Sequence, residues 1–204
     1  MDVDGLLLRK AVVAGSGLAY WIGVLIQARR VRRQIGRSPN MMPRTTKERV
    51  LWFGWMLVIA VWIGQPFFAG GENARAFVRL CSPLVHEAVM IPGVLLVAAG
   101  FAGTLWCYAV MGSAWRIGVN THEKNELVTA GPFARVRHPI YALQVVMLAG
   151  ALCLLPTACS LLLLAFHLVC VWVKAADEEA YLVATHGDSY CAHLARTGRL
   201  FPKL

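Results

Sequence analysis

Four long uncharged runs constrain the fold of this sequence more than any other feature. The first three are Ala11–Ala28, Val50–Gly71 and Ala88–Trp115, with 18, 22 and 28 residues. Crossing a hydrocarbon core about 30 Å thick takes roughly 20 helical residues, so each of these runs predicts one transmembrane helix. The composition agrees, because 15% of the residues are charged, whereas a soluble domain usually has roughly 25%.

The fourth run, Ile140–Val173, has 34 residues and is too long for one crossing. Its middle reads "LCLLPTACS", in which Pro156 lacks a backbone N–H and disfavours helix in the residue before it. We therefore predict two helices, Ile140–Leu154 and Thr157–Val173, joined as a tight hairpin. The expected fold is an all-α integral membrane protein with five transmembrane helices in a single domain, residues 1–204.

The charge distribution predicts the orientation in the membrane. The net charge is +9, and the basic loop, Arg29–Arg49, holds eight basic residues and one acid, Glu48. Basic loops stay on the cytoplasmic side, so we expect the N-terminus outside and the C-terminus inside. The basic loop is interpreted as this topology signal, with contact to anionic lipid headgroups as the alternative. No nucleic-acid-binding motif accompanies it, so membrane lipids are the expected partners.

The cysteines bear on disulfides and metal binding, and the N-terminal apolar run bears on signal-peptide cleavage. Six cysteines are spread along the chain without a C-x-x-C pair or the spacing of a zinc site. The sequence therefore predicts neither a disulfide framework nor a metal site. The first apolar run ends at arginines and no A-x-A-like site follows it, which favours a retained helix over a cleaved signal peptide.

Two polar segments flank the predicted hairpin, Val119–Tyr141 before it and Val173–Pro202 after it. A tight antiparallel hairpin returns both of its ends to one membrane face, so these segments should meet there. Unpaired charges at a membrane edge are costly, which predicts pairing across the gap or around a ligand. An ordinary interfacial belt of salt bridges is the alternative. The polar residues involved are Arg135, Arg137, His138 and Tyr141 before the hairpin, and Lys174, Asp177, Glu178, Glu179, His186 and Tyr190 after it.

The order of motifs in the C-terminal half adds a family resemblance. The chain reads "LVTAGPFARVRHPIY", then the hairpin, then "EEAYLVATHGDSY" and "RLFP". Together these resemble the isoprenylcysteine carboxyl methyltransferase and phospholipid methyltransferase superfamily of integral-membrane enzymes, over about Met111–Pro202. The resemblance divides the domain into N-terminal transmembrane helices, residues 1–110, and a methyltransferase-like catalytic core, residues 111–204.

The resemblance implies a membrane methyltransferase that binds S-adenosyl-L-methionine at the cytosolic face. The acceptor it implies is lipophilic or lipid-linked: an isoprenylcysteine-like carboxylate, a phospholipid amine or a small thiol. The catalytic residues it implies are Arg137, Lys174 and Glu178, with Lys174 also binding the acceptor. The cofactor-binding positions are Asn125, Glu126, Leu127, Val128, Phe133, Arg137, His138, Pro139, Ile140, Tyr141 and Glu178.

The sequence departs from the pattern of the family in three ways. Asn125 and Glu126 stand where many relatives have a histidine, and Phe133 replaces the commoner tyrosine. Lys174 occupies the position of an arginine that binds a carboxylate, and an ammonium cannot form the bidentate fork of a guanidinium.

Proton transfer and surface charge give further expectations. If the acceptor is an amine or a thiol, the candidates for a general base are Glu178, Glu179 and His186. We expect Arg135, His186 and His193 at the surface. The oligomeric state cannot be predicted from these patterns.

Two other functions stay open. One is an NADPH-dependent membrane reductase like the sterol reductases, whose C-terminal architecture is related but which are longer. The other is a non-catalytic membrane protein whose basic loop binds anionic lipid.

Overall fold

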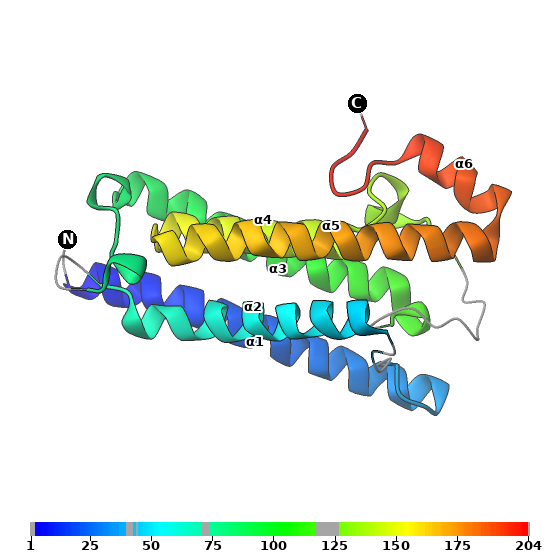
Figure 1. Cartoon of the computed structure of the whole chain (residues 1–204), viewed down its shortest axis with the longest axis horizontal. Coiled ribbons are helices and arrows are strands. Elements are labelled where there is room, and N and C mark those ends of the chain that lie inside the picture. Colours follow the sequence, from blue (N-terminus) through cyan, green and yellow to red (C-terminus); the bar gives the residue numbers. More distant parts are fainter. Residues whose placement is uncertain (1–2, 40–42, 44, 71–73, 117–126, 204) are drawn as a thin grey trace.

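The structure is a computed structural model of the whole chain and describes residues 3–39, 43, 45–70, 74–116 and 127–203. Its described elements are helices that run mostly along one axis (Figure 1). The α-helices are α1 (Val3–Ile35), α2 (Thr46–Phe68), α3 (Glu87–Met111), α4 (Pro139–Leu154), α5 (Ala158–His186) and α6 (Asp188–Arg196). The 3-10 turns are η1 (Ala76–Val78), η2 (Ser82–Leu84), η3 (Gly112–Ala114) and η4 (Gly131–Ala134).

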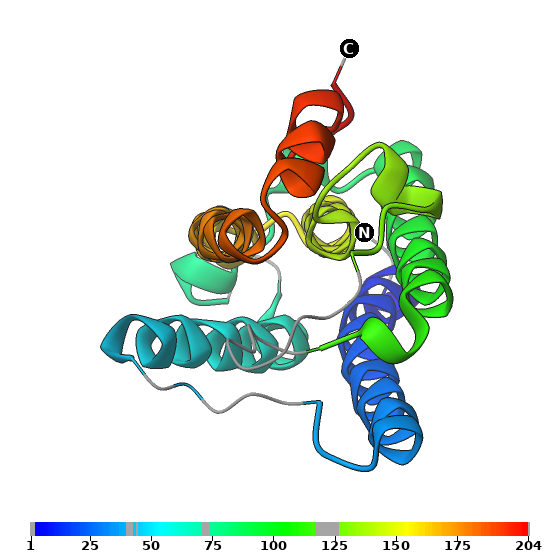
Figure 2. The ribbon, with the colours of Figure 1, turned by 90° about the vertical axis from the view of Figure 1, so that its right-hand side faces the viewer.

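Four of the described helices are long and apolar enough to cross a membrane, and the chain is an integral membrane protein. They are α1, α2, α3 with η3, and α5. Helix α4 is shorter, with 16 residues, or about 24 Å at the rise of an α-helix. It lies in the middle of the bundle, beside α3 and α5, when the helices are viewed end on (Figure 2). The prediction of five transmembrane helices is therefore supported for four of them.

The predicted hairpin is confirmed, and its turn lies where the sequence places it. Helix α4 ends at Leu154, and the Thr157 side chain caps α5 by accepting a hydrogen bond from the Ser160 backbone N–H at 3.0 Å. Pro156 has no N–H to donate, which ends the first helix before it. Helix α5 continues past the predicted boundary at Val173 to His186, so its last turns extend beyond the apolar stretch.

Helices α3 and α4 pack closely because small residues face each other. A Cβ on Gly150 would lie 2.7 Å from the Gly93 carbonyl oxygen, and one on Gly103 would lie 2.7 Å from Leu143 Cδ2. Small residues allow this approach between membrane helices. The contact holds α4, and hence the start of the hairpin, in a fixed position.

We expect Gly150→Ala to destabilise the bundle by about 1–3 kcal/mol, because the added methyl overlaps the α3 backbone. Thermal unfolding of the detergent-solubilised protein, followed by tryptophan fluorescence, measures the effect as a lower Tm. Gly64→Ala is the matched control, since nothing lies within 4 Å of its added Cβ. Equal Tm values for the two variants would contradict the packing argument.

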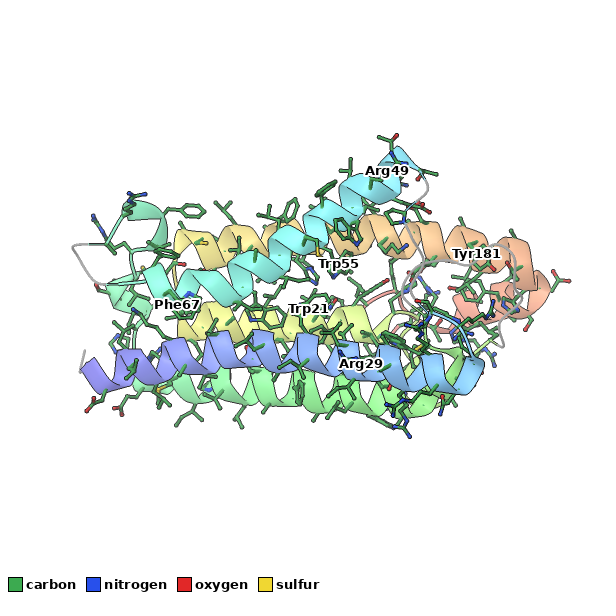
Figure 3. The ribbon with its side chains drawn as sticks, turned by 90° about the horizontal axis from the view of Figure 1, so that it is seen from below. Trp21, Arg29, Arg49, Trp55, Phe67 and Tyr181 are labelled. Atoms are coloured by element: carbon green, nitrogen blue, oxygen red, sulfur yellow. The ribbon has the colours of Figure 1, made fainter. Side chains whose placement is uncertain are left out.

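The first two helices diverge toward one end of the bundle. Figure 3 shows α1 and α2 close together near Phe67 and apart near Arg49. A Cβ on Gly17 of α1 would lie 2.9 Å from Ile63 Cγ1, whereas one on Gly54 of α2 would lie 3.2 Å from Phe166 Cζ of α5. The N-terminal half of α2 therefore packs on α5. At its start, Lys47 Nζ lies 2.5 Å from Asp177 Oδ1 of α5.

Candidate functional site

The two polar segments flanking the hairpin meet, as the sequence predicts, and the C-terminal tail joins them. The backbone N–H of Arg137 donates to the Gly198 carbonyl at 2.8 Å, and that of His138 donates to the Arg199 carbonyl at 3.1 Å. In return the Gly198 N–H donates to the Arg135 carbonyl at 3.2 Å. Helix α4 begins at the next residue, so the tail pairs with the two residues that lead directly into the helix.

Glu179 is the centre of a buried ion group. Its carboxylate accepts from Arg137 Nε at 2.8 Å and from Arg199 at 2.6 Å and 3.0 Å, while its side chain is 10% exposed. The Arg199 guanidinium also lies over the Trp172 ring, 4.5 Å from the centroid. Two cations on one carboxylate leave it little capacity to accept a proton from a reacting group.

The Arg137 guanidinium is engaged on its other side as well. It donates to the backbone carbonyls of Thr197 and Leu194 at the end of α6. These hydrogen bonds, with the one to Glu179, join Arg137 to α5, α6 and the tail. The role of Arg137 in holding a cofactor stays a prediction, and the contacts seen here are those of a residue that positions its neighbours.

Glu178, the next residue along α5, has a different set of partners. Its Oε1 accepts from the Tyr141 hydroxyl at 2.7 Å and lies 3.9 Å from Lys174 Nζ. Its Oε2 lies 3.4 Å from His138 Nδ1. Lys174 and Glu178 share one helix face, as their i, i+4 spacing predicts. We call Tyr141, His138, Lys174 and Glu178 the Glu178 site.

His138 stands between the two glutamates. Its Nε2 lies 3.4 Å from Glu179 Oε1, but the geometry is not that of a hydrogen bond and this buried nitrogen has no hydrogen-bond partner among the described residues. Its ring stacks on Tyr141 at an interplanar angle of 12°. Burial alone would lower the pKa of His138, but the interactions with Glu178 and Glu179 outweigh burial and raise it above its ordinary value.

This raised pKa of His138 predicts a pH-dependent stability. A group that binds its proton more tightly in the folded state adds to the free energy of unfolding. The contribution is complete below the unfolded pKa of the group and is lost as the pH rises through its folded pKa. The Tm advantage of the wild type over His138→Gln should therefore shrink as the pH rises from about 6.5, the ordinary pKa of histidine, into the alkaline range. Thermal unfolding across that range measures it, and a constant difference would contradict the charged pair.

The other predicted cofactor positions are buried or half-buried, or lie outside the described residues. Phe133 is buried on η4 and Pro139 is buried at the first position of α4, while Ile140 is half-buried beside it. Leu127 and Val128 are half-buried. Two further predicted positions, Asn125 and Glu126, lie outside the described residues.

The surface beside the motif is hollowed by a groove of about 550 Å³. Helix α3 lines it with Gly103 and Trp106, and η4 lines it with Pro132, followed by Arg135. Arg135 is exposed, as predicted. None of the residues of the Glu178 site lines this groove.

One expectation was wrong: His193 is buried rather than at the surface, with 5% of it exposed. Helix α6 turns back along the end of the hairpin after Gly187 (φ +56°), so its inner face, with Tyr190 and His193, packs inward. Burial, followed by the charges of Arg137 and Arg196, lowers the pKa of His193. His186, at the last position of α5, is half-buried and lies about 12 Å along the helix from Glu178.

Sequence reasoning missed three contributors to the site. Arg199 pairs with Glu179 and lies over the Trp172 ring, and the signal for Arg199 was its place in "RLFP". Gly198 is the third contributor. A Cβ at this position would collide with the Phe201 backbone. The tail can therefore follow this path only with glycine at that position.

Comparison with known proteins gives two relatives. The chain is 28% identical over 122 residues to the nickel-cobalt-cadmium resistance protein NccN of Alcaligenes xylosoxydans xylosoxydans, covering 59% of this chain and 53% of that protein. It is 24% identical over 120 residues to the cobalt-zinc-cadmium resistance protein CzcN of Cupriavidus metallidurans, covering 59% and 52%. The chain therefore spans about half the length of the curated relatives it matches.

A protein-family comparison covers the hairpin and the residues on both sides of it. The model of the isoprenylcysteine carboxyl methyltransferase (ICMT) family matches residues 93–184. This range contains α4, most of α3 and α5, and every residue of the Glu178 site. This match, together with the two ordered motifs, supports the assignment of this segment of the chain to the isoprenylcysteine carboxyl methyltransferase superfamily.

Proposed function

We propose that this protein is a membrane methyltransferase that uses S-adenosyl-L-methionine and methylates a lipophilic or lipid-linked acceptor. The observation that carries the proposal is the Glu178 site. The Glu178 carboxylate interacts with a tyrosine, a histidine and a lysine. It lies on α5 just beyond the end of the apolar run, within the segment that matches the family. A donor in the cytosol and an acceptor in the membrane can both reach such a position.

The residues present suit the charged groups of the cofactor. S-Adenosyl-L-methionine has a carboxylate, an ammonium group and ribose hydroxyls. The buried, unpartnered Nε2 of His138 is a donor for the carboxylate, and Glu178 is an acceptor for the ammonium or a hydroxyl. Arg137 supports this arrangement by holding Glu179 and the tail behind His138.

The chain contributes mainly alignment to the reaction. When bound, the cofactor supplies a methyl group that its sulfonium makes electrophilic. The Glu178 site would hold donor and acceptor in line, and positioning of this kind lowers barriers by several kcal/mol. Lys174 would attract an anionic acceptor group, and Glu178 would accept a proton where the acceptor is an amine or a thiol. Glu179, with two arginines on it, is the weaker candidate for that role.

Orientation follows from the charges and the shape of the bundle. We propose that the N-terminus is outside and that the C-terminus and the Glu178 site are cytoplasmic. In support, the two termini lie at opposite ends of the bundle (Figure 1), and the end with the C-terminus carries the basic loop. Five crossings, with α4 as a short central one, agree with that arrangement.

Titration calorimetry with S-adenosyl-L-methionine and its demethylated product tests the proposal on the detergent-solubilised protein. We expect saturable binding of both by the wild type and a loss of about tenfold or more in affinity for His138→Ala, which removes one charge-assisted contact. Arg135→Ala is the matched control, because its exposed side chain lies in the same motif outside the site.

Other outcomes of the same titration decide between functions. No binding by the folded wild type, or an equal affinity in His138→Ala, overturns the proposal. Saturation by NADPH in its place indicates a reductase. Loss of association with anionic vesicles on neutralising the basic loop, with no cofactor binding, indicates the non-catalytic alternative. Metal resistance appears in the names of both relatives, and we propose that any such role of this chain acts through methylation.

A further inference from the structure

Buried polar side chains continue from the Glu178 site into the bundle. The Trp55 ring of α2 lies 5.6 Å from the Tyr141 ring and 5.4 Å from the His167 ring of α5. The Tyr20 side chain of α1 lies near the Gln144 side chain of α4. We call Tyr20, Trp55, Tyr141, Gln144 and His167 the interior polar cluster.

Two members of this cluster have unused hydrogen-bonding atoms. His167 is 1% exposed, and neither of its ring nitrogens has a partner among the described residues. Gln144 is 4% exposed, and its Oε1 is likewise unpartnered. Both lie roughly ten residues from the hairpin turn, so they are at similar depths on antiparallel helices. Buried polar atoms in folded proteins are normally paired, which points to a missing partner.

The unpartnered atoms of His167 and Gln144 indicate the chemistry of that partner. A neutral imidazole offers one donor and one acceptor, and the amide oxygen offers one more acceptor. A hydroxyl can accept from the imidazole N–H and donate to one of the two acceptors, so it satisfies two of these three atoms. A charged group would be costly at this depth in a membrane protein, and a hydrocarbon chain would leave all three atoms unpaired.

The distance between His167 and the Glu178 site determines how far the hydroxyl lies from the reacting end of the acceptor. Lys174 and His167 are seven residues apart on α5, which is about 10 Å along the helix. Trp55, next to His167, is half-exposed on the part of α2 that diverges from α1 (Figure 3). A chain that extends from the Glu178 site along Trp55 therefore reaches His167.

We infer that the interior polar cluster binds the acceptor a second time, through a hydroxyl about 10 Å from the methylated atom. This inference rests on the proposed function and narrows the substrate class. The acceptor is a hydroxylated amphiphile, and an unbroken alkyl or prenyl chain is a poorer ligand. His167 is then a residue that determines specificity and takes no part in the methyl transfer.

A matched pair of probes tests this with the full chain in phosphatidylcholine nanodiscs. The probes are 1,7-heptanediol and 1-heptanol, which differ only in the far hydroxyl. With ¹⁵N-labelled histidine, the His167 signals are identified by their loss in His167→Phe, among the six histidines of the chain. The diol should shift the His167 signals and bind about tenfold more tightly than heptanol, as expected for one buried hydrogen bond.

Three variants complete the test. His167→Phe keeps an aromatic ring on Trp55 and should lose the preference for the diol, as should Gln144→Leu. His86→Phe, exposed at the opposite end of the bundle, should keep it. Equal binding of both probes by the wild type, unshifted His167 signals, or a preference that survives His167→Phe would overturn the inference.

Cofactor titration of the same samples separates this inference from the proposed function. Binding of S-adenosyl-L-methionine without a preference for the diol overturns the second acceptor site alone. A diol preference that depends on His167, without cofactor binding, leaves the hydroxyl site standing and overturns the methyltransferase proposal.

Discussion

Replacing Glu179 by alanine should lower the free energy of unfolding by about 3–5 kcal/mol, because it removes one partner of a buried ion group. Arg137 and Arg199 would then share a buried region without a counterion, and their side chains are 10% and 24% exposed. The tail held by Arg137 should detach first. Thermal unfolding and limited proteolysis at the C-terminus measure the two effects.

Asp177→Ala is the matched control for this prediction. Asp177 lies on the same helix as Glu179, and its carboxylate pairs with Lys47 of α2 at 2.5 Å. The Lys47 and Asp177 side chains are 57% and 37% exposed. Exposed pairs contribute roughly 0–1 kcal/mol, so the control should change the Tm little. Similar losses in both variants would show that Glu179 is an ordinary surface partner, and would contradict its role as the anchor of the tail.

The hairpin and the meeting of its flanking segments could be predicted because both follow from local rules. Pro156 ends a helix wherever it stands, and a tight turn returns the chain to the same membrane face. Each of these inferences needs only the neighbouring residues or the geometry of two joined helices.

The different roles of Glu178 and Glu179 could not be predicted. Neighbouring residues on a helix point about 100° apart, so one carboxylate faces Tyr141 and the other faces the tail. Which is which depends on the path of the chain after α5, and Gly187 and α6 determine that path. The burial of His193 escaped prediction for the same reason.

A buried charge at the other end of the bundle was also missed. Arg9 is 3% exposed and donates to the His86 carbonyl at 2.8 Å and to the Leu154 carbonyl at 3.2 Å. Next to Lys10, just before the first apolar run, it resembles an ordinary membrane-flanking residue. One partner is the carbonyl at the C-terminus of α4, where the helix dipole favours a cation, and the other is the carbonyl just before α3. Only the tertiary structure brings them together.

Glu178→Gln should weaken binding of S-adenosyl-L-methionine by roughly 10- to 100-fold, the range expected when a charged hydrogen-bond partner is lost. The substitution keeps the shape and the hydrogen bond from Tyr141 while removing the charge that faces His138 and Lys174. Tyr141→Phe should weaken binding less, because it removes one hydrogen bond to Glu178 and leaves the carboxylate charged. Calorimetry on the solubilised variants measures both.

The neighbouring residue separates this local effect from a change in overall charge. Asp177→Asn removes the same charge one position away, on the side of α5 that faces Lys47, and should leave the affinity for the cofactor unchanged. If Asp177→Asn weakens binding as much as Glu178→Gln does, the effect is a general attraction to an anionic surface. A selective loss in Glu178→Gln, with a Tm close to that of the wild type, means that the carboxylate contacts the cofactor, because a merely structural role would lower the Tm along with the affinity.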